Sequence, residues 1–86
     1  MDGIDNTISE VLARVLANGV APADIDHNAD LVNEYGIDSL QMISLLLGIE
    51  DEFDLELDYD SLQLEDLQSV RHLASYVRGL RVEVSG

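Results

Sequence analysis

The sequence predicts an all-α fold, a small helical bundle of three main helices plus a short helix, with a long loop between helices one and two. Three stretches of the chain carry apolar residues at the three- and four-residue spacing of a buried helix face. The chain has 86 residues and no cysteine, so these faces must build the core without any disulfide. We expect residues 1–86 to form one domain, with about 81–86 as a frayed tail.

The first helix is expected to begin near Thr7 and to end near Gly19. Thr7 and Glu10 match a capping box, in which the hydroxyl and the carboxylate each satisfy an unpaired backbone N–H. The connection that follows runs to Asp38, and a loop of about 20 residues usually carries function or a short extra turn. Its spaced apolar residues should anchor it on the core: Val20, Ile25, Leu31 and Val32.

The second helix should run from about Ser39 to Phe53, with Asp38 as its N-cap. One face of this helix forms an ordinary core stripe, because its apolar residues recur at helical spacing. The stripe consists of Met42, Leu45, Leu46, Ile49 and Phe53.

A second apolar ridge, formed by Leu40, Ile43 and Leu47, falls on a different face of the same helix. A protein with one core needs only the first stripe, so the ridge has two explanations. Either the long loop covers it, or it is exposed as a docking strip for partner proteins beside Ser39. The sequence leaves both open.

Residues 53–59 alternate apolar and acidic side chains at period two, which is typical of a strand. The only partner for such a strand is the terminal segment 81–86, and an isolated two-stranded ribbon is marginal in water. We therefore expect an extended loop that passes into a short helix around Ser61 to Leu67. The last helix should open at Ser69 and bury one face, which carries Val70, Leu73, Ala74, Val77 and Leu80.

Clustered acids in the same region resemble the ligand pattern of an EF-hand calcium loop. An EF-hand needs a glycine at its sixth position for a sharp turn, and Tyr59 stands there. We therefore expect weak, adventitious binding of divalent ions and no dedicated metal site. The acids at the ligand positions are Asp54, Glu56, Asp58, Asp60 and Glu65.

The chain is strongly acidic, with 18 Asp and Glu residues, four arginines, no lysine and a net charge of −14. Such a surface repels nucleic acids and anionic membranes, and it favours a partner protein with a basic docking patch. No apolar run approaches the about 18 residues of a membrane span, and the N-terminus lacks the features of a signal peptide. We expect a monomeric, cytoplasmic protein.

Ser39 opens the second helix directly after an acidic residue. Nucleophilic catalysis would require a base within reach, but His27 and His72 are the only imidazoles and no G-x-S-x-G turn is present. We therefore expect no catalytic residue. A helix N-terminus does favour a phosphate, because its free N–H groups and positive dipole end attract an anion. Ser39 suits the attachment of a phosphodiester by another enzyme, although considered alone it is also an ordinary first-turn residue.

The motif Gly36-Ile37-Asp38-Ser39-Leu40, the stretch IEDEFDLEL and the order of the helices resemble the acyl carrier proteins over essentially the whole chain. The resemblance implies that Ser39 carries 4′-phosphopantetheine, which a phosphopantetheinyl transferase attaches from coenzyme A. It also implies that Asp38 supports attachment by helping to hold the magnesium ion used during transfer. Helix two would be the main surface for partner enzymes, through Leu40, Gln41, Ile43, Ser44, Leu47, Glu50 and Asp51.

On this resemblance the chain is expected to be a discrete acyl carrier protein and not an enzyme. It would hold acyl intermediates as thioesters and present them to acyltransferases, ligases or synthases that act in trans. Gln41 and Ser44 replace acids that many fatty-acid carriers have, which favours polyketide or other specialised biosynthesis, such as that of antibiotics. Two alternatives stay open: an aminoacyl or peptidyl carrier, and an unmodified acidic helical module that binds partners or calcium.

Overall fold

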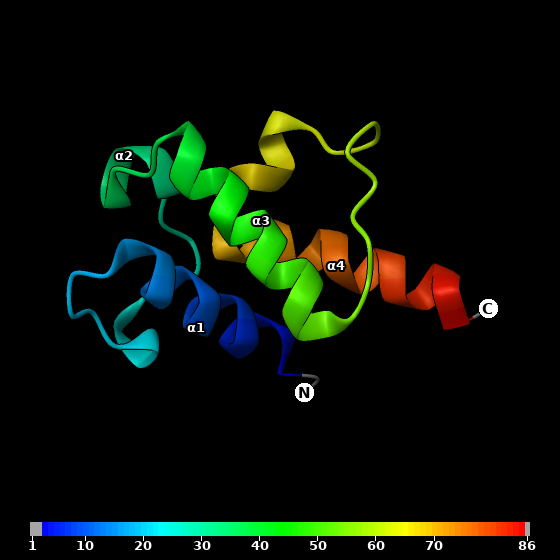
Figure 1. Ribbon diagram of the computed structural model, residues 1–86, viewed down its shortest axis with the longest axis horizontal. Coiled ribbons are helices and arrows are strands. Elements are labelled where there is room, and N and C mark those ends of the chain that lie inside the picture. Colours follow the sequence, from blue (N-terminus) through cyan, green and yellow to red (C-terminus); the bar gives the residue numbers. More distant parts are fainter. Residues whose placement is uncertain (1–2, 86) are drawn as a thin grey trace.

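The computed structural model describes the backbone of residues 3–85 and the side chains up to residue 80. Over this range it contains four α-helices, two short 3-10 helices and no strand (Figure 1). The predicted all-α class is therefore confirmed. The elements are α1 (Ile4–Leu16), η1 (Pro22–Asp24), α2 (Leu31–Tyr35), α3 (Ser39–Phe53), η2 (Leu64–Leu67) and α4 (Val70–Ser85).

α1 packs against both α3 and α4, so these three helices form the bundle that encloses the core. The short 3-10 helices cover its edges, with η1 against α1 and η2 against α4. Figure 1 shows that α2 and η2 lie near the N-terminal half of α3. This arrangement leaves a groove between α3 on one side and α2 with η2 on the other.

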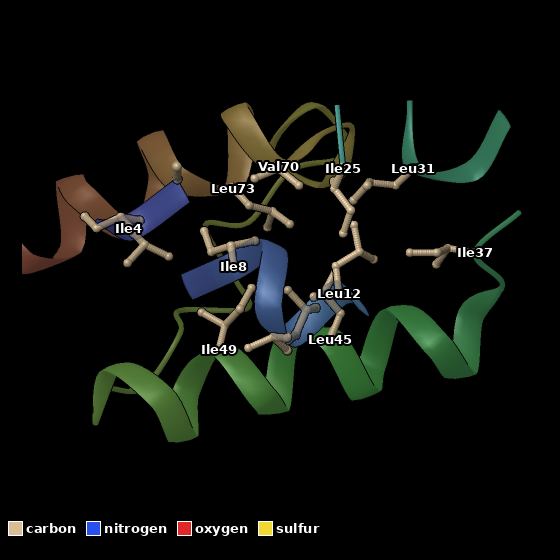
Figure 2. Packing of buried hydrophobic residues seen from close by; sticks show 14 of the residues in the cluster. Ile4, Ile8, Leu12, Ile25, Leu31, Ile37, Leu45, Ile49, Val70 and Leu73 are labelled. Carbon is tan, nitrogen blue, oxygen red and sulfur yellow. The ribbon is translucent and has the colours of Figure 1, made fainter. Parts of the chain in front are cut away.

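The core is made of aliphatic side chains from the three long helices (Figure 2). Ile8 and Leu12 of α1 point toward Leu45 and Ile49 of α3, and Leu73 of α4 approaches from the other side. All five side chains are at most 1% exposed. Because burial of apolar surface is the main favourable term in folding, these contacts hold the bundle together.

The apolar stripes predicted for the second and last helices are largely buried. In α3, Leu45, Leu46 and Ile49 are buried, whereas Met42 and Phe53 at the ends of the stripe are half-buried. In α4, the buried members of the predicted face are Val70, Leu73, Ala74 and Val77, and Leu80 is half-buried.

α1 begins one turn earlier than predicted, and the capping box expected at Thr7 is not formed. Gly3 is the N-cap in a left-handed conformation, and the Thr7 hydroxyl donates a hydrogen bond to the Gly3 carbonyl over 3.1 Å. Ile4 explains the longer helix, because its side chain is only 1% exposed and extends the buried stripe. The helix ends at Leu16, where Ala17 adopts the left-handed C-cap conformation that was expected near Gly19.

The long connection between α1 and α3 contains η1 and α2, which agrees with the expected extra turn. Ile25 and Leu31 are buried and anchor it as predicted, and Val20 is half-buried against the core. Val32 was predicted to be an anchor too, but its side chain is 56% exposed. Since Leu31 already occupies the inward face of the five-residue α2, its neighbour Val32 must point outward.

The segment between α3 and α4 is extended, as expected, but its short helix starts at Leu64 and not at Ser61. A turn precedes it, because the Asp58 carbonyl accepts hydrogen bonds from the Ser61 hydroxyl and from the Tyr76 hydroxyl of α4. Leu57 is buried beside this turn, with 6% exposure. Ser61 is therefore part of this turn and does not start the short helix as predicted.

The α4 backbone continues as a helix to Ser85. The frayed tail predicted for 81–86 falls outside the residues whose side chains are described, so it stays a prediction. A membrane crossing would require a longer and more apolar helix than any in the described part of the chain.

Gly48, in the middle of α3, lies against Val11 of α1. A Cβ added at Gly48 would be 2.5 Å from Cγ1 of Val11, whose β-branched side chain is stiff and only 2% exposed. We expect Gly48→Ala to lower the free energy of unfolding by about 1–3 kcal/mol through overpacking, despite the better helix propensity of alanine. Urea unfolding followed by circular dichroism measures this change.

Gly79 in α4 is the matched control for Gly48. A Cβ at Gly79 would meet no atom within 4 Å, and the residue is exposed. Gly79→Ala should therefore raise stability by about 0.5–1 kcal/mol, because alanine costs less conformational entropy in a helix. If both substitutions shift stability in the same direction, the tight contact between α1 and α3 does not exist in solution.

Candidate functional site

Ser39 is the first residue of the 15-residue α3, and its side chain is exposed. The preceding Asp38 is the N-cap, as predicted, with an extended backbone (φ −96°, ψ −177°). Its Oδ1 atom accepts a hydrogen bond of 2.8 Å from the backbone N–H of Gln41. The hydroxyl of Ser39 therefore stands at the positive end of the longest helix whose side chains are fully described.

The cap is closed from the other side by Gln41. Its Oε1 atom accepts a hydrogen bond of 3.2 Å from the backbone N–H of Asp38, which completes a capping box. Sequence reasoning treated Gln41 only as a partner-contact residue and missed this role. The signal was present in the spacing, because an acid followed three residues later by Gln is the capping-box pattern.

The chain that leads into Ser39 is also held in place. Gly36 caps α2 in the left-handed conformation (φ 67°), which glycine adopts without strain, and its N–H donates to the Val32 carbonyl over 3.0 Å. Ile37 is only 4% exposed, and its N–H donates to the Leu31 carbonyl over 3.2 Å. The bridge from α2 to α3 is therefore anchored directly before Asp38 and Ser39.

An apolar groove of about 720 Å³ lies beside Ser39. Its walls are α3, α2 and η2. Leu31 and Gln68 join two of these walls, because the Leu31 N–H donates to the Gln68 carbonyl over 2.9 Å. The lining consists of Asp30, Val32, Asn33, Ile37, Asp38, Ser39, Met42, Ile43, Leu46, Leu64, Leu67 and Gln68.

A second groove, of about 460 Å³, lies between α1 and the opposite side of α3. Leu40, Gln41, Ser44 and Asp51, all expected to bind partners, contribute to it. Arg14 of α1 also lines it and pairs with Glu52 over 3.0 Å on an exposed surface. The lining is completed by Val11, Val15 and Gly48.

The predicted apolar ridge on α3 is exposed, so the long loop does not cover it. Leu40, Ile43 and Leu47 are 76%, 53% and 55% exposed, respectively. The ridge starts beside Ser39, and Val32 and Leu64 add exposed apolar side chains across the adjacent groove. Of the two explanations for the ridge, the structure supports the one in which it is free to contact other molecules.

Glu50, another expected partner-binding residue, has its carboxylate engaged within the protein. One oxygen accepts the Leu57 N–H over 2.9 Å, and the other accepts the Tyr59 hydroxyl over 3.0 Å. Desolvation, followed by this hydrogen bond and the charge of Glu50, raises the pKa of Tyr59 above its ordinary value. Glu50 therefore holds the loop after α3, whereas Asp51 is exposed. Their part in partner binding stays a prediction.

The two histidines have structural partners and line neither groove beside Ser39. Nδ1 of His72 is 2.6 Å from the hydroxyl of Ser69, and Nδ1 of His27 is 3.6 Å from a carboxylate oxygen of Asp5. Among the residues that the structure describes, no three His, Asp or Glu side chains are grouped so as to hold a metal ion.

Residues 6–77 match the family described as the phosphopantetheine attachment site. This match covers most of the chain, so the protein belongs to the family of carrier proteins that bear a covalently attached 4′-phosphopantetheine group. It is therefore a non-catalytic carrier protein.

Two groups of solved structures are similar to the chain. A holo acyl carrier protein from Nitrosomonas europaea matches with a TM-score of 0.81 and 19% identity, covering 95% of this chain and 99% of that one. A Bradyrhizobium japonicum structure of glycine:[carrier protein] ligase complexed with its cognate carrier protein matches with a TM-score of 0.78 and 33% identity, covering 91% and 99%. The corresponding complex with glycylated carrier protein matches at 32% identity with a TM-score of 0.67, covering 85% and 97%.

Proposed function

We propose that this protein carries an amino acid, which a separate ligase loads onto a phosphopantetheine arm attached to Ser39. The observation that carries this proposal is the similarity at 33% identity, over nearly the full length of both chains, to a structure of a glycine ligase with its carrier protein. The match to the Nitrosomonas carrier, at 19% identity, supports the fold alone. The similarity thus favours the aminoacyl alternative over an acyl carrier of polyketide biosynthesis.

The residues around Ser39 fit the attachment of a phosphopantetheine group to its hydroxyl. The hydroxyl is exposed, so a transferase can reach it, and the first N–H groups of α3 lack acceptors within the helix. An anionic phosphodiester is favoured at this position by those N–H groups and by the helix dipole. When bound, the group supplies a thiol at the end of a flexible arm, on which cargo is held as a thioester.

Asp38 contributes to the same site in two ways. Its Oδ1 atom caps α3, while the other carboxylate oxygen is available on an exposed side chain. We propose that this second oxygen helps to hold the magnesium ion during attachment of the arm by a phosphopantetheinyl transferase.

Partner enzymes are proposed to dock on α3 next to Ser39. The exposed ridge of Leu40, Ile43 and Leu47 provides apolar contact area, and Asp51 provides charge for a basic partner surface. Gln41 and Ser44 line the groove between α3 and α1. Such a surface is consistent with a ligase and a transferase that act in trans.

An acyl carrier role in polyketide or other specialised biosynthesis is the second candidate. The apolar groove of about 720 Å³ beside Ser39 favours it, because an aliphatic acyl chain could be buried there, whereas a glycyl group would not need it.

The test compares the two cargoes on one preparation. The protein is first converted to its arm-bearing form with coenzyme A and a broad-specificity phosphopantetheinyl transferase. It is then incubated either with ATP, glycine or other small amino acids and the Bradyrhizobium ligase, or with malonyl-coenzyme A and a malonyltransferase. We expect intact-mass spectrometry to show an added amino acid that hydroxylamine removes. Loading of the malonyl group alone would favour the acyl carrier role instead.

A further inference from the structure

We propose that Gln41 is a positioning residue for the modification of Ser39. By closing the capping box, its side chain holds the Asp38–Ser39 peptide in the geometry that a transferase requires. The inference rests on the proposed attachment of the arm at Ser39. It assigns to Gln41 a role inside the site, in addition to the partner contact proposed from its position on α3.

The contacts of Gln41 support this role. The Asp38 N–H donates to Gln41 Oε1 over 3.2 Å, and the Gln41 N–H donates to Asp38 Oδ1 over 2.8 Å. The first bond uses the side chain of Gln41, whereas the second uses the Gln41 backbone and the side chain of Asp38; together they clamp Asp38 and Gln41 to each other. Ser39 lies between the clamped residues, so its Cα position and the direction of its side chain depend on the clamp.

On its carbonyl side Asp38 is held by the helix, because its carbonyl accepts the Met42 N–H over 2.9 Å, so the side chain of Gln41 adds its hold at the Asp38 N–H. Ile37, on one side, is buried, but Asp38 and Ser39 are both exposed and receive no support from the core. On the other side, Leu45 is the first fully buried residue of α3, more than a helical turn away. Without the side chain of Gln41, the Asp38 N–H would lose its acceptor in the protein, and the start of the helix could fray by one residue.

Proper placement of Ser39 matters because the reaction is a group transfer to its hydroxyl. The Ser39 oxygen forms a bond to the phosphorus atom of coenzyme A that bears the pantetheine arm, the pyrophosphate bond breaks, and adenosine 3′,5′-bisphosphate leaves. The hydroxyl proton goes to a base of the transferase. A nucleophile that is displaced by a fraction of an ångström reacts more slowly even when binding is unchanged.

The experiment measures transferase kinetics on the intact protein with Gln41→Ala, Gln41→Glu and Ser75→Ala. Glutamate retains the acceptor of the capping box, whereas alanine removes it. Ser75 is exposed on α4 and lines neither groove beside α3, so Ser75→Ala controls for a substitution outside the cap and the docking surface. A second readout, independent of the transferase, is the hydrogen-exchange rate of the Asp38 amide measured by NMR on the protein without its arm.

We expect Gln41→Ala to lower kcat about tenfold with little change in KM, on the order seen for a misplaced reacting group. The Asp38 amide should exchange about tenfold faster, because its acceptor is gone. Gln41→Glu should restore both values to near those of the original protein, and Ser75→Ala should leave both unchanged.

Two results would overturn the inference. One is faster exchange at Asp38 with unchanged kcat for Gln41→Ala, which would show that the cap does not position Ser39. The other is a Gln41→Glu protein that keeps the amide protected but is as slow as Gln41→Ala, which would point to direct contact with the transferase. Failure of the unsubstituted protein to gain the arm at Ser39 would instead reject the proposed function.

Discussion

Replacing Ser39 by alanine is expected to abolish attachment of phosphopantetheine while leaving the helical circular dichroism nearly unchanged. Attachment needs the hydroxyl oxygen itself, so loss of that atom should remove the reaction completely. The fold should tolerate the change, because Ser39 is exposed and the cap of α3 is made by Asp38 and Gln41. Alanine is also a good helix former.

The measurement is intact mass after incubation with coenzyme A and the transferase, with a thermal melt of the same sample. Ser75→Ala is the matched control, because Ser75 is an exposed serine on α4, outside the proposed docking surface, and should leave loading intact. A Ser39→Ala protein that still acquires the arm would show that another residue is the attachment site.

Replacing Leu45 by alanine is expected to lower the free energy of unfolding by about 2–5 kcal/mol. Leu45 is fully buried, and its side chain lies in the core opposite Leu12 of α1 (Figure 2). The substitution removes buried methyl groups and leaves a cavity between α1 and α3 that the surrounding helices can fill only in part. A decrease of this size is a large fraction of the total free energy of unfolding of a small domain.

Leu47, two residues further along the same helix, provides the comparison. It is 55% exposed, so Leu47→Ala should change stability by no more than about 0.5 kcal/mol. It should instead slow loading by a partner ligase, because it removes part of the proposed docking ridge. Urea unfolding and the loading rate measured on both variants separate the two effects. A large loss of stability for Leu47→Ala would mean that the ridge is covered in solution.

The helix that carries the candidate site could be predicted from the sequence to within its observed bounds. Asp38 as N-cap, Ser39 as first helical residue and Phe53 as last residue all agree with the structure. These features could be predicted because capping and helical periodicity depend on residues that are close in sequence. The buried stripe on α3 was predicted for the same reason.

Predictions failed where distant contacts decided the outcome. Thr7 and Glu10 had the spacing of a capping box, but burial of Ile4 made a longer helix more favourable. Val32 is an apolar residue that was expected to anchor the loop, but its side chain is exposed because Leu31 takes the inward position on α2. In both cases the local sequence pattern was present, but burial of a different residue in the core decided the local structure.

The sequence by itself determined the helical class, the acidic surface and the position of an exposed serine at the start of α3, because these follow from composition and short-range spacing. Only the tertiary structure decided that the ridge of Leu40, Ile43 and Leu47 stays uncovered. It also decided that Val32, in the connection before α3, faces outward across the groove from this helix. The physical reason is that exposure and hydrogen-bond partners depend on where segments far apart in the chain come to lie, which periodicity within one helix does not specify.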